Sequence, residues 1–257
     1  MKKIIWSLIF IPGLLAAQNS SDTLTWTREV VEHNDSFRND SFDFSIHCHY
    51  RQEYVLFSGN TDADSINRLL IEMLVNKNIS DKSQVKKELE TYGDSFTRSW
   101  RQNLPADMYS LAMGYEDQTS IQVAFQNRNY TTVLYNNYGY MGGAHGLSLQ
   151  RYLSFQRPGG KLVENWQDLV TDTTAILKLA ERTFKKEKNI QKFRSKSHMW
   201  FWGGDFYLSS NFGLTDEGIR FVYTEYEIAP YAYGSTELLL PYAEIRDYLK
   251  VKYLDAP

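Results

Sequence analysis

The chain has 257 residues, of which 42% are hydrophobic and 23% charged, a composition that supports a folded core and excludes a disordered or collagen-like chain. Its 28 lysines and arginines are outnumbered by 31 aspartates and glutamates, which gives a net charge of -3. Nucleic-acid binders are usually basic, so we expect no nucleic-acid partner. The single cysteine excludes an internal disulfide framework.

Residues 1–17 have the pattern of a secretory signal peptide. Two lysines precede an apolar run over residues 4–15, and two alanines follow, ending at Ala17. The run is shorter than the roughly 20 apolar residues that span a bilayer. We expect cleavage near Ala17 and a mature chain that is soluble, without stable membrane insertion, in the periplasm or outside the cell. An uncleaved anchor is the alternative.

Residues 18–41 are polar and rich in Asn, Asp and Ser, which predicts a flexible lead-in. Apolar and polar residues then alternate over residues 42–48, which predicts a strand with Cys48 on its buried side. His47 and His49 share the opposite side, where they suit either zinc or a solvated polar face. A third ligand at definite spacing is missing, so we expect no metal and no other cofactor.

Helical periodicity is found in three segments. The first is an apolar stripe over residues 66–74, with Asp62 and Asp64 placed to cap it. The third runs from a cap at Asp172 to Phe184, and a short last helix is expected after Pro241. The second segment is predicted from the stripe Val85, Leu89, Tyr92 and Phe96.

Between these helices the period changes to 2, which predicts strands. Residues 109–115 and 121–125 are interpreted as a hairpin around a turn at residues 116–118. Because helices and strands do not alternate strictly, the pattern favours an α+β fold with antiparallel sheets covered by a few helices. We place a domain boundary between 42–129 and 130–257. Further strands are expected at residues 130–138, 147–155, 206–208, 219–226 and 238–240.

Residues 139–146 form the most unusual local string, with four glycines in eight residues. Gly142, Gly143 and Gly146 allow positive φ and close backbone approach. Exposed amides there can bind an anion, with His145 as an acid or base beside it. The alternative is a structural turn in which His145 bonds to backbone. No nucleophile elbow, zincin helix or phosphate loop occurs, so we expect a protein that is not an enzyme, and a hydrolase using His145 is the alternative.

Residues 198–204 place Trp200 and Trp202 in an aromatic cluster before two glycines. Such a cluster suits a platform for stacking sugars or a contact site for a protein, and filling of the core is the alternative.

Residues 228–234 carry Pro230, Tyr231, Tyr233 and Gly234 between two predicted strands. Proline stiffens the loop, glycine lets it turn, and two tyrosines supply contact area at low entropic cost. The composition predicts an exposed recognition loop, and a loop folded back with its rings on the core is the alternative.

Three strings in order carry a family resemblance. They are residues 138–146, residues 206–208 with 218–221, and residues 226–234 with 240–242. Together they resemble the RsiV-like family, which comprises the extracytoplasmic domain of lysozyme-sensing anti-sigma factors and a module of PdaC-type polysaccharide deacetylases. The resemblance covers about residues 130–250. Residues 40–128 resemble the companion domain of unknown function that usually precedes it.

The resemblance implies an exported binding module of the bacterial cell envelope. Its expected partner is a lysozyme-like protein or an envelope component such as peptidoglycan. Binding of peptidoglycan glycan through Trp200, Trp202 and the tyrosine-rich loop at residues 228–234 is the alternative. No anti-sigma segment, transmembrane helix or deacetylase domain is recognisable in the sequence, so we expect neither transmembrane signalling nor deacetylation.

Overall fold

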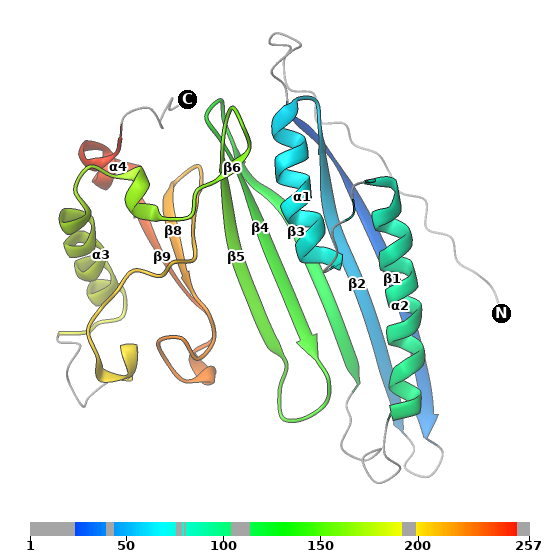
Figure 1. Cartoon of the computed structure of the whole chain (residues 1–257). Coiled ribbons are helices and arrows are strands. Elements are labelled where there is room, and N and C mark those ends of the chain that lie inside the picture. Colours follow the sequence, from blue (N-terminus) through cyan, green and yellow to red (C-terminus); the bar gives the residue numbers. More distant parts are fainter. Residues whose placement is uncertain are drawn as a thin grey trace.

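The computed structural model describes residues 24–39, 44–75, 79, 81–103, 114–191 and 199–250. Within these residues the chain forms a six-stranded sheet and a three-stranded sheet, each with helices packed against it (Figure 1). This arrangement confirms the predicted α+β class. The predicted signal peptide and residues 109–113 of the predicted hairpin lie outside the described residues. No helix of the described part is long and apolar enough to cross a membrane.

The six-stranded sheet follows the order of the chain. Neighbouring strands pair antiparallel, except that β2 and β3 run parallel. A parallel pair needs a long crossover, which two helices supply here. The strands are β1 (Thr25–Asn39), β2 (Phe44–Ser58), β3 (Tyr115–Gln126), β4 (Tyr130–Tyr140), β5 (Leu147–Gln156) and β6 (Lys161–Leu162).

The crossover helices α1 (Thr61–Val75) and α2 (Ser83–Asn103) cover one face of this sheet (Figure 1). The predicted stripes are mostly buried, as Ile66 and Leu89 illustrate. Tyr92 was expected on the inner face and is instead 55% exposed. Its neighbour Gly93 is the residue that lies against the sheet, because a Cβ there would be 2.6 Å from the ring of Tyr50.

Two predictions along this sheet were wrong. Residues 25–39 are not a flexible lead-in, because their backbone pairs with β2 along the whole of β1. A polar edge strand has the same composition as a loop, which explains the error. Residues 116–118 are not a turn but part of β3, so they belong to a strand paired with both β2 and β4. Cys48 is buried as predicted, and burial raises the pKa of its thiol to about 12.

The three-stranded sheet packs against α3 (Thr173–Glu187). Asp172 caps this helix as predicted, since its Oδ1 accepts a hydrogen bond from Ala175 N at 2.9 Å. The predicted strand at residues 206–208 is absent from this described segment, which is irregular. The remaining elements are β7 (Phe212–Leu214), β8 (Gly218–Tyr223), β9 (Thr236–Pro241) and α4 (Tyr242–Ile245).

Side-chain hydrogen bonds join the two sheets beside β5. Asn211 accepts from Tyr152 N at 3.1 Å and donates to Gln150 O at 2.6 Å. Ser154 Oγ accepts from Leu214 N at 3.0 Å. The predicted boundary between residues 129 and 130 falls at the β3–β4 turn, inside the six-stranded sheet. Along the chain, the six-stranded sheet ends with β6 and the three-stranded sheet begins with β7.

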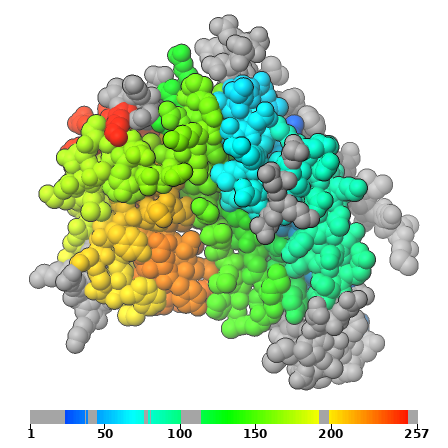
Figure 2. All heavy atoms as spheres, viewed as in Figure 1, coloured from blue at the N-terminus to red at the C-terminus, as the bar shows by residue number. Residues whose placement is uncertain are grey.

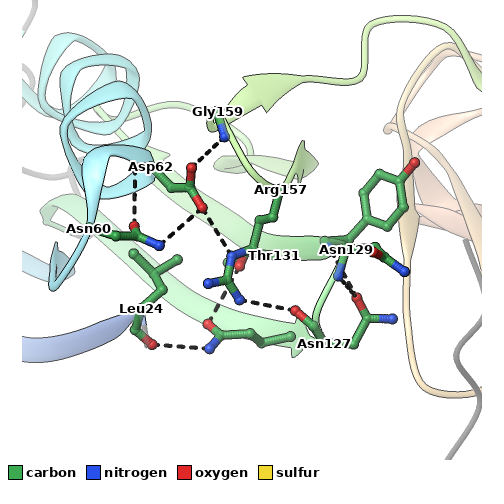
Figure 3. A network of polar contacts seen from close by, with 10 residues as sticks. Leu24, Asn60, Asp62, Asn127, Asn129, Thr131, Arg157 and Gly159 are labelled. Atoms are coloured by element: carbon green, nitrogen blue, oxygen red, sulfur yellow. Dashed lines mark hydrogen bonds and ion pairs between the residues drawn. The ribbon is translucent and has the colours of Figure 1, made fainter. Parts of the chain in front are cut away.

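A buried ion pair attaches α1 to the turn between β5 and β6 (Figure 3). Arg157 Nε lies 3.1 Å from Asp62 Oδ2, and the two side chains are 7% and 1% exposed. Gly159 N also donates to Asp62, and Arg157 donates to Asn127 O at 3.0 Å. Asp62 is therefore not the predicted helix cap. Asn60 has that role, because its Oδ1 accepts from Asp62 N at 3.1 Å.

Candidate functional site

The loop of residues 141–146 joins β4 to β5 and contains all but the first two residues of the glycine-rich string, which end β4. Gly142 (φ +87°) and Gly143 (φ +103°) lie in the left-handed region. Tyr140 OH donates to Gly143 O at 2.8 Å. A Cβ on Gly146 would lie 2.5 Å from the ring of Tyr138, so this position needs glycine for close packing. The geometry agrees with the predicted structural turn.

Replacing Gly143 by valine is expected to lower the free energy of unfolding by about 1 kcal/mol or more. The cause is backbone strain at positive φ, because nothing lies within 4 Å of a Cβ built at this position. Gly139→Val is the matched control, since Gly139 also has open space and has no positive φ. Thermal melts of both variants measure the difference, and equal melting temperatures would contradict the strain argument.

His145 projects from this loop onto an aromatic residue of the loop between β8 and β9. Its ring stacks on Tyr231, with centroids 3.8 Å apart and an interplanar angle of 19°. Its Nδ1 lies 2.9 Å from Gly146 O and its Nε2 3.2 Å from Tyr226 OH. Tyr231 OH donates to Gly146 O at 3.1 Å. Two of the strings that carried the resemblance therefore meet in space.

The predicted recognition loop is a short 3-10 turn, Tyr231–Tyr233, between Pro230 and Gly234. Gly234 has φ +65°, as its predicted role in turning the chain requires. Tyr233 is 54% exposed, whereas Tyr231 is partly buried against His145. The loop thus combines the two predicted alternatives: one ring is presented to solvent and the other folds back.

The predicted tryptophan cluster is a second 3-10 turn, Trp200–Gly203, beside the same loop. Trp200 packs edge-on against Tyr233, with ring centroids 5.0 Å apart, and against Phe184 of α3 at 5.5 Å. Trp202 is 51% exposed. Its Nε1 donates to the carbonyls of residues 226 and 227 at 3.3 Å, which fixes the ring on the surface.

These segments lie at one end of the molecule, the lower end in Figure 1. In Figure 2 the orange atoms of the recognition loop lie between the yellow turn and the green β4–β5 hairpin. We call their side chains the aromatic surface. It comprises His145, Trp200, Trp202, Tyr207, Tyr226, Tyr231 and Tyr233.

The backbone under the aromatic surface is held in unusual conformations. Phe201 (φ 53°), Trp202 (φ 52°) and Tyr226 (φ 66°) are left-handed without being glycine. In the described part of the chain only Asn189 shares this property. Bulky residues rarely adopt such angles unless the surrounding structure holds them there, and such strain concentrates at functional sites.

The hydrogen-bond partners of His145 bear on catalysis. Within the described residues they are a backbone carbonyl and a tyrosine hydroxyl, and neither is a carboxylate. Glu227 lies nearby but accepts from Thr224 N at 2.9 Å and from Tyr207 OH. Burial, with the charge of Glu227 adding to it, raises the pKa of Tyr207 to about 12.

His47 and His49 lie elsewhere, on β2 at the far side of the six-stranded sheet from its helices. His47 is exposed, and His49 Nε2 lies 3.2 Å from Glu32 Oε1. Over the described ranges no three His, Cys, Asp or Glu side chains come together in a way that would hold a metal.

Sequence reasoning missed Tyr207 and Tyr226 as site residues, although both lie within the strings that carried the resemblance. Tyr226 is 48% exposed and Tyr207 is 43% exposed. A signal was available for Tyr226 alone, because it ends the predicted strand at residues 219–226, whereas Tyr207 lies in the middle of the predicted strand at residues 206–208.

The fold and the surface define an α+β protein of two sheets, with an aromatic surface where loops from both sheets meet. Comparison with known proteins finds a family model that matches part of the chain. The family model "Protein of unknown function (DUF3298)" matches residues 167–243, which include α3 and the three-stranded sheet. None of the curated proteins matches the chain.

Two solved structures of DUF3298 family proteins resemble this fold. One, from Bacteroides fragilis, has a TM-score of 0.68 at 20% identity, and the match covers 90% of this chain and 95% of the Bacteroides chain. The other, from Pseudomonas aeruginosa, has a TM-score of 0.61 at 18% identity and covers 90% and 97%. At these identities the likeness shows a shared fold that extends over both sheets.

Proposed function

We propose that this chain is an exported, non-catalytic binding module of the bacterial cell envelope, and that the aromatic surface binds its partner. One observation carries the proposal. Three separate segments meet in one exposed surface whose central residues have strained backbones. Core packing alone does not require half-exposed Trp202 and Tyr233.

A rigid surface suits binding because it loses little entropy when the partner docks. The indole of Trp202 is fixed by its hydrogen bonds, and Tyr231 is fixed between His145 and Gly146 O. Tyrosine and tryptophan are also the residues most often found at the energetic centre of interfaces. The absence of a carboxylate among the described hydrogen-bond partners of His145 favours binding over hydrolysis.

The partner class follows from the RsiV-like resemblance of residues 138–146 and 226–234, which implies a lysozyme-like protein. Export follows from the pattern of residues 1–17. A second candidate is the glycan of peptidoglycan, and the observation that favours it is the half-exposed ring of Trp202, because sugars stack on such faces.

Calorimetry of the mature chain with lysozyme, and separately with soluble peptidoglycan fragments, tests both candidates. Tyr233→Ala is expected to weaken lysozyme binding by about 2 kcal/mol, roughly thirtyfold. Trp202→Ala is expected to weaken glycan binding more than lysozyme binding if the glycan is the partner. Trp26→Ala is the matched control, since Trp26 is 44% exposed on β1, away from the aromatic surface.

If Tyr233→Ala binds the partner as tightly as the wild type does, the aromatic surface is not the binding site. Failure of the wild-type chain to bind either partner would reject the proposed function. Melting temperatures of all variants separate lost contacts from lost folding.

A further inference from the structure

Asp117 is a carboxylate on the face of the six-stranded sheet that carries the helices. It is in register with Tyr50 of β2 and Gly139 of β4, so the three residues project to the same side. The ring of Tyr50 packs against Tyr92 of α2, with centroids 5.6 Å apart, which identifies this side as the helix side.

This end of the sheet is open on the side of β4. A Cβ on Gly139 would have nothing within 4 Å. In Figure 1, α1 lies over the upper part of the sheet, and no helix lies in front of the lower ends of β3 and β4. The position on β4 that pairs with Asp117 is therefore not covered by another described residue.

The polar groups around Asp117 leave acceptors unused. Asn137 Nδ2 and Gln52 Nε2 both donate to Asp117 Oδ1, at 3.2 and 3.4 Å. Over the described part of the chain, Asp117 Oδ2 accepts no hydrogen bond, and neither do the amide oxygens of Asn137 and Gln52. Burial raises the pKa of Asp117, although these two hydrogen bonds oppose the shift.

Aromatic rings border the same point. Tyr92 is 55% exposed and lies beside the buried Tyr50. Tyr50 pairs with Asp117 across the β2–β3 register and packs against Tyr92, so both rings lie on the side of the carboxylate. Burial, followed by the charge of Asp117, raises the pKa of both hydroxyl groups.

A surface of oxygen acceptors and tyrosine rings, on which the amide N–H groups of Asn137 and Gln52 are already used, is complementary to a group that only donates and is positively charged. An aliphatic ammonium has three N–H donors and no acceptor, and it is attracted to carboxylates and to aromatic rings. We propose that Asp117, Asn137, Gln52 and Tyr92 form a binding site for an aliphatic ammonium group, separate from the aromatic surface. The ammonium belongs to a lysine side chain or to an amino sugar.

NMR titration of the mature chain with two ammonium probes tests this site. The probes are Nα-acetyl-lysine amide and glucosamine, each compared with its form acetylated on the amine. We expect saturable shifts around Asp117 with at least one ammonium probe, and none with its acetylated form. The probe that binds identifies the source of the ammonium.

The matched variants are Asp117→Asn and Glu116→Gln, which remove the same charge from neighbouring residues. Glu116 projects to the opposite face, where it accepts from Gln118 Nε2 at 2.7 Å. Asp117→Asn is expected to lower the affinity about tenfold or more, and Glu116→Gln to leave it unchanged. Tyr92→Leu, at an exposed position, is the second variant and is also expected to weaken binding. It tests the site if Asp117→Asn does not fold.

Three results would overturn the proposal: no saturable binding of either ammonium probe, equal binding by Asp117→Asn, or equal binding of the acetylated probes. These outcomes are independent of lysozyme or glycan binding at the aromatic surface.

Discussion

Replacing Arg157 by methionine is expected to lower the free energy of unfolding by about 3–5 kcal/mol. The substitution leaves the Asp62 carboxylate enclosed at 1% exposure without its guanidinium partner. It also removes the hydrogen bond that Arg157 donates to Asn127 O. Chemical denaturation monitored by circular dichroism measures the loss.

Arg151→Met is the matched control, because Arg151 lies on β5 and is exposed. Surface substitutions of this kind usually change stability by less than about 0.5 kcal/mol. The double variant Asp62→Asn, Arg157→Met is expected to recover part of the stability, because it removes the unpaired charge. A loss in Arg157→Met no larger than that in Arg151→Met would show that the buried pair contributes nothing.

Truncating Phe184 to alanine is expected to cost about 3–5 kcal/mol and to loosen the aromatic surface. Phe184 is fully buried on α3, and its ring packs against Phe201 at 5.2 Å and Trp200 at 5.5 Å. A cavity there leaves the turn that carries Trp202 without its support. For a chain of this size each kcal/mol corresponds to about 2–4 °C in melting temperature.

Leu177→Ala on the same helix is the control, since Leu177 is 38% exposed. Thermal melts give the stability of both variants, and indole fluorescence reports the surroundings of the tryptophans. A fluorescence spectrum that stays unchanged in folded Phe184→Ala would show that the aromatic surface does not depend on this ring.

The helices and many strands could be predicted because their signals are local. The stripe at residues 66–74 and the cap at Asp172 depend on side chains a few positions apart. The parallel pairing of β2 with β3 could not be predicted, since it joins strands separated by two helices. Residues 116–118 were predicted as a turn because their side chains are polar. Asp117 is accommodated within a strand by hydrogen bonds from Asn137 and Gln52, which lie on neighbouring strands far away in the sequence.

The candidate site shows the same division. Gly142, Gly143 and Gly234 could be recognised because a backbone with positive φ favours glycine. The contact between His145 and Tyr231 could not, because it depends on how two sheets pack. The positive φ angles of Phe201, Trp202 and Tyr226 could not be predicted either, since aromatic residues do not favour them.

The contact of His145 with Tyr231 also joins two bodies of the chain mechanically. One ring is carried by a hairpin of the six-stranded sheet and the other by a loop of the three-stranded sheet. A rotation of one sheet against the other that separates these two loops would break the stacking of the rings. A partner that covers both rings would therefore hold the two sheets at one angle. By mass action, its binding free energy stabilises the arrangement of the sheets that it binds.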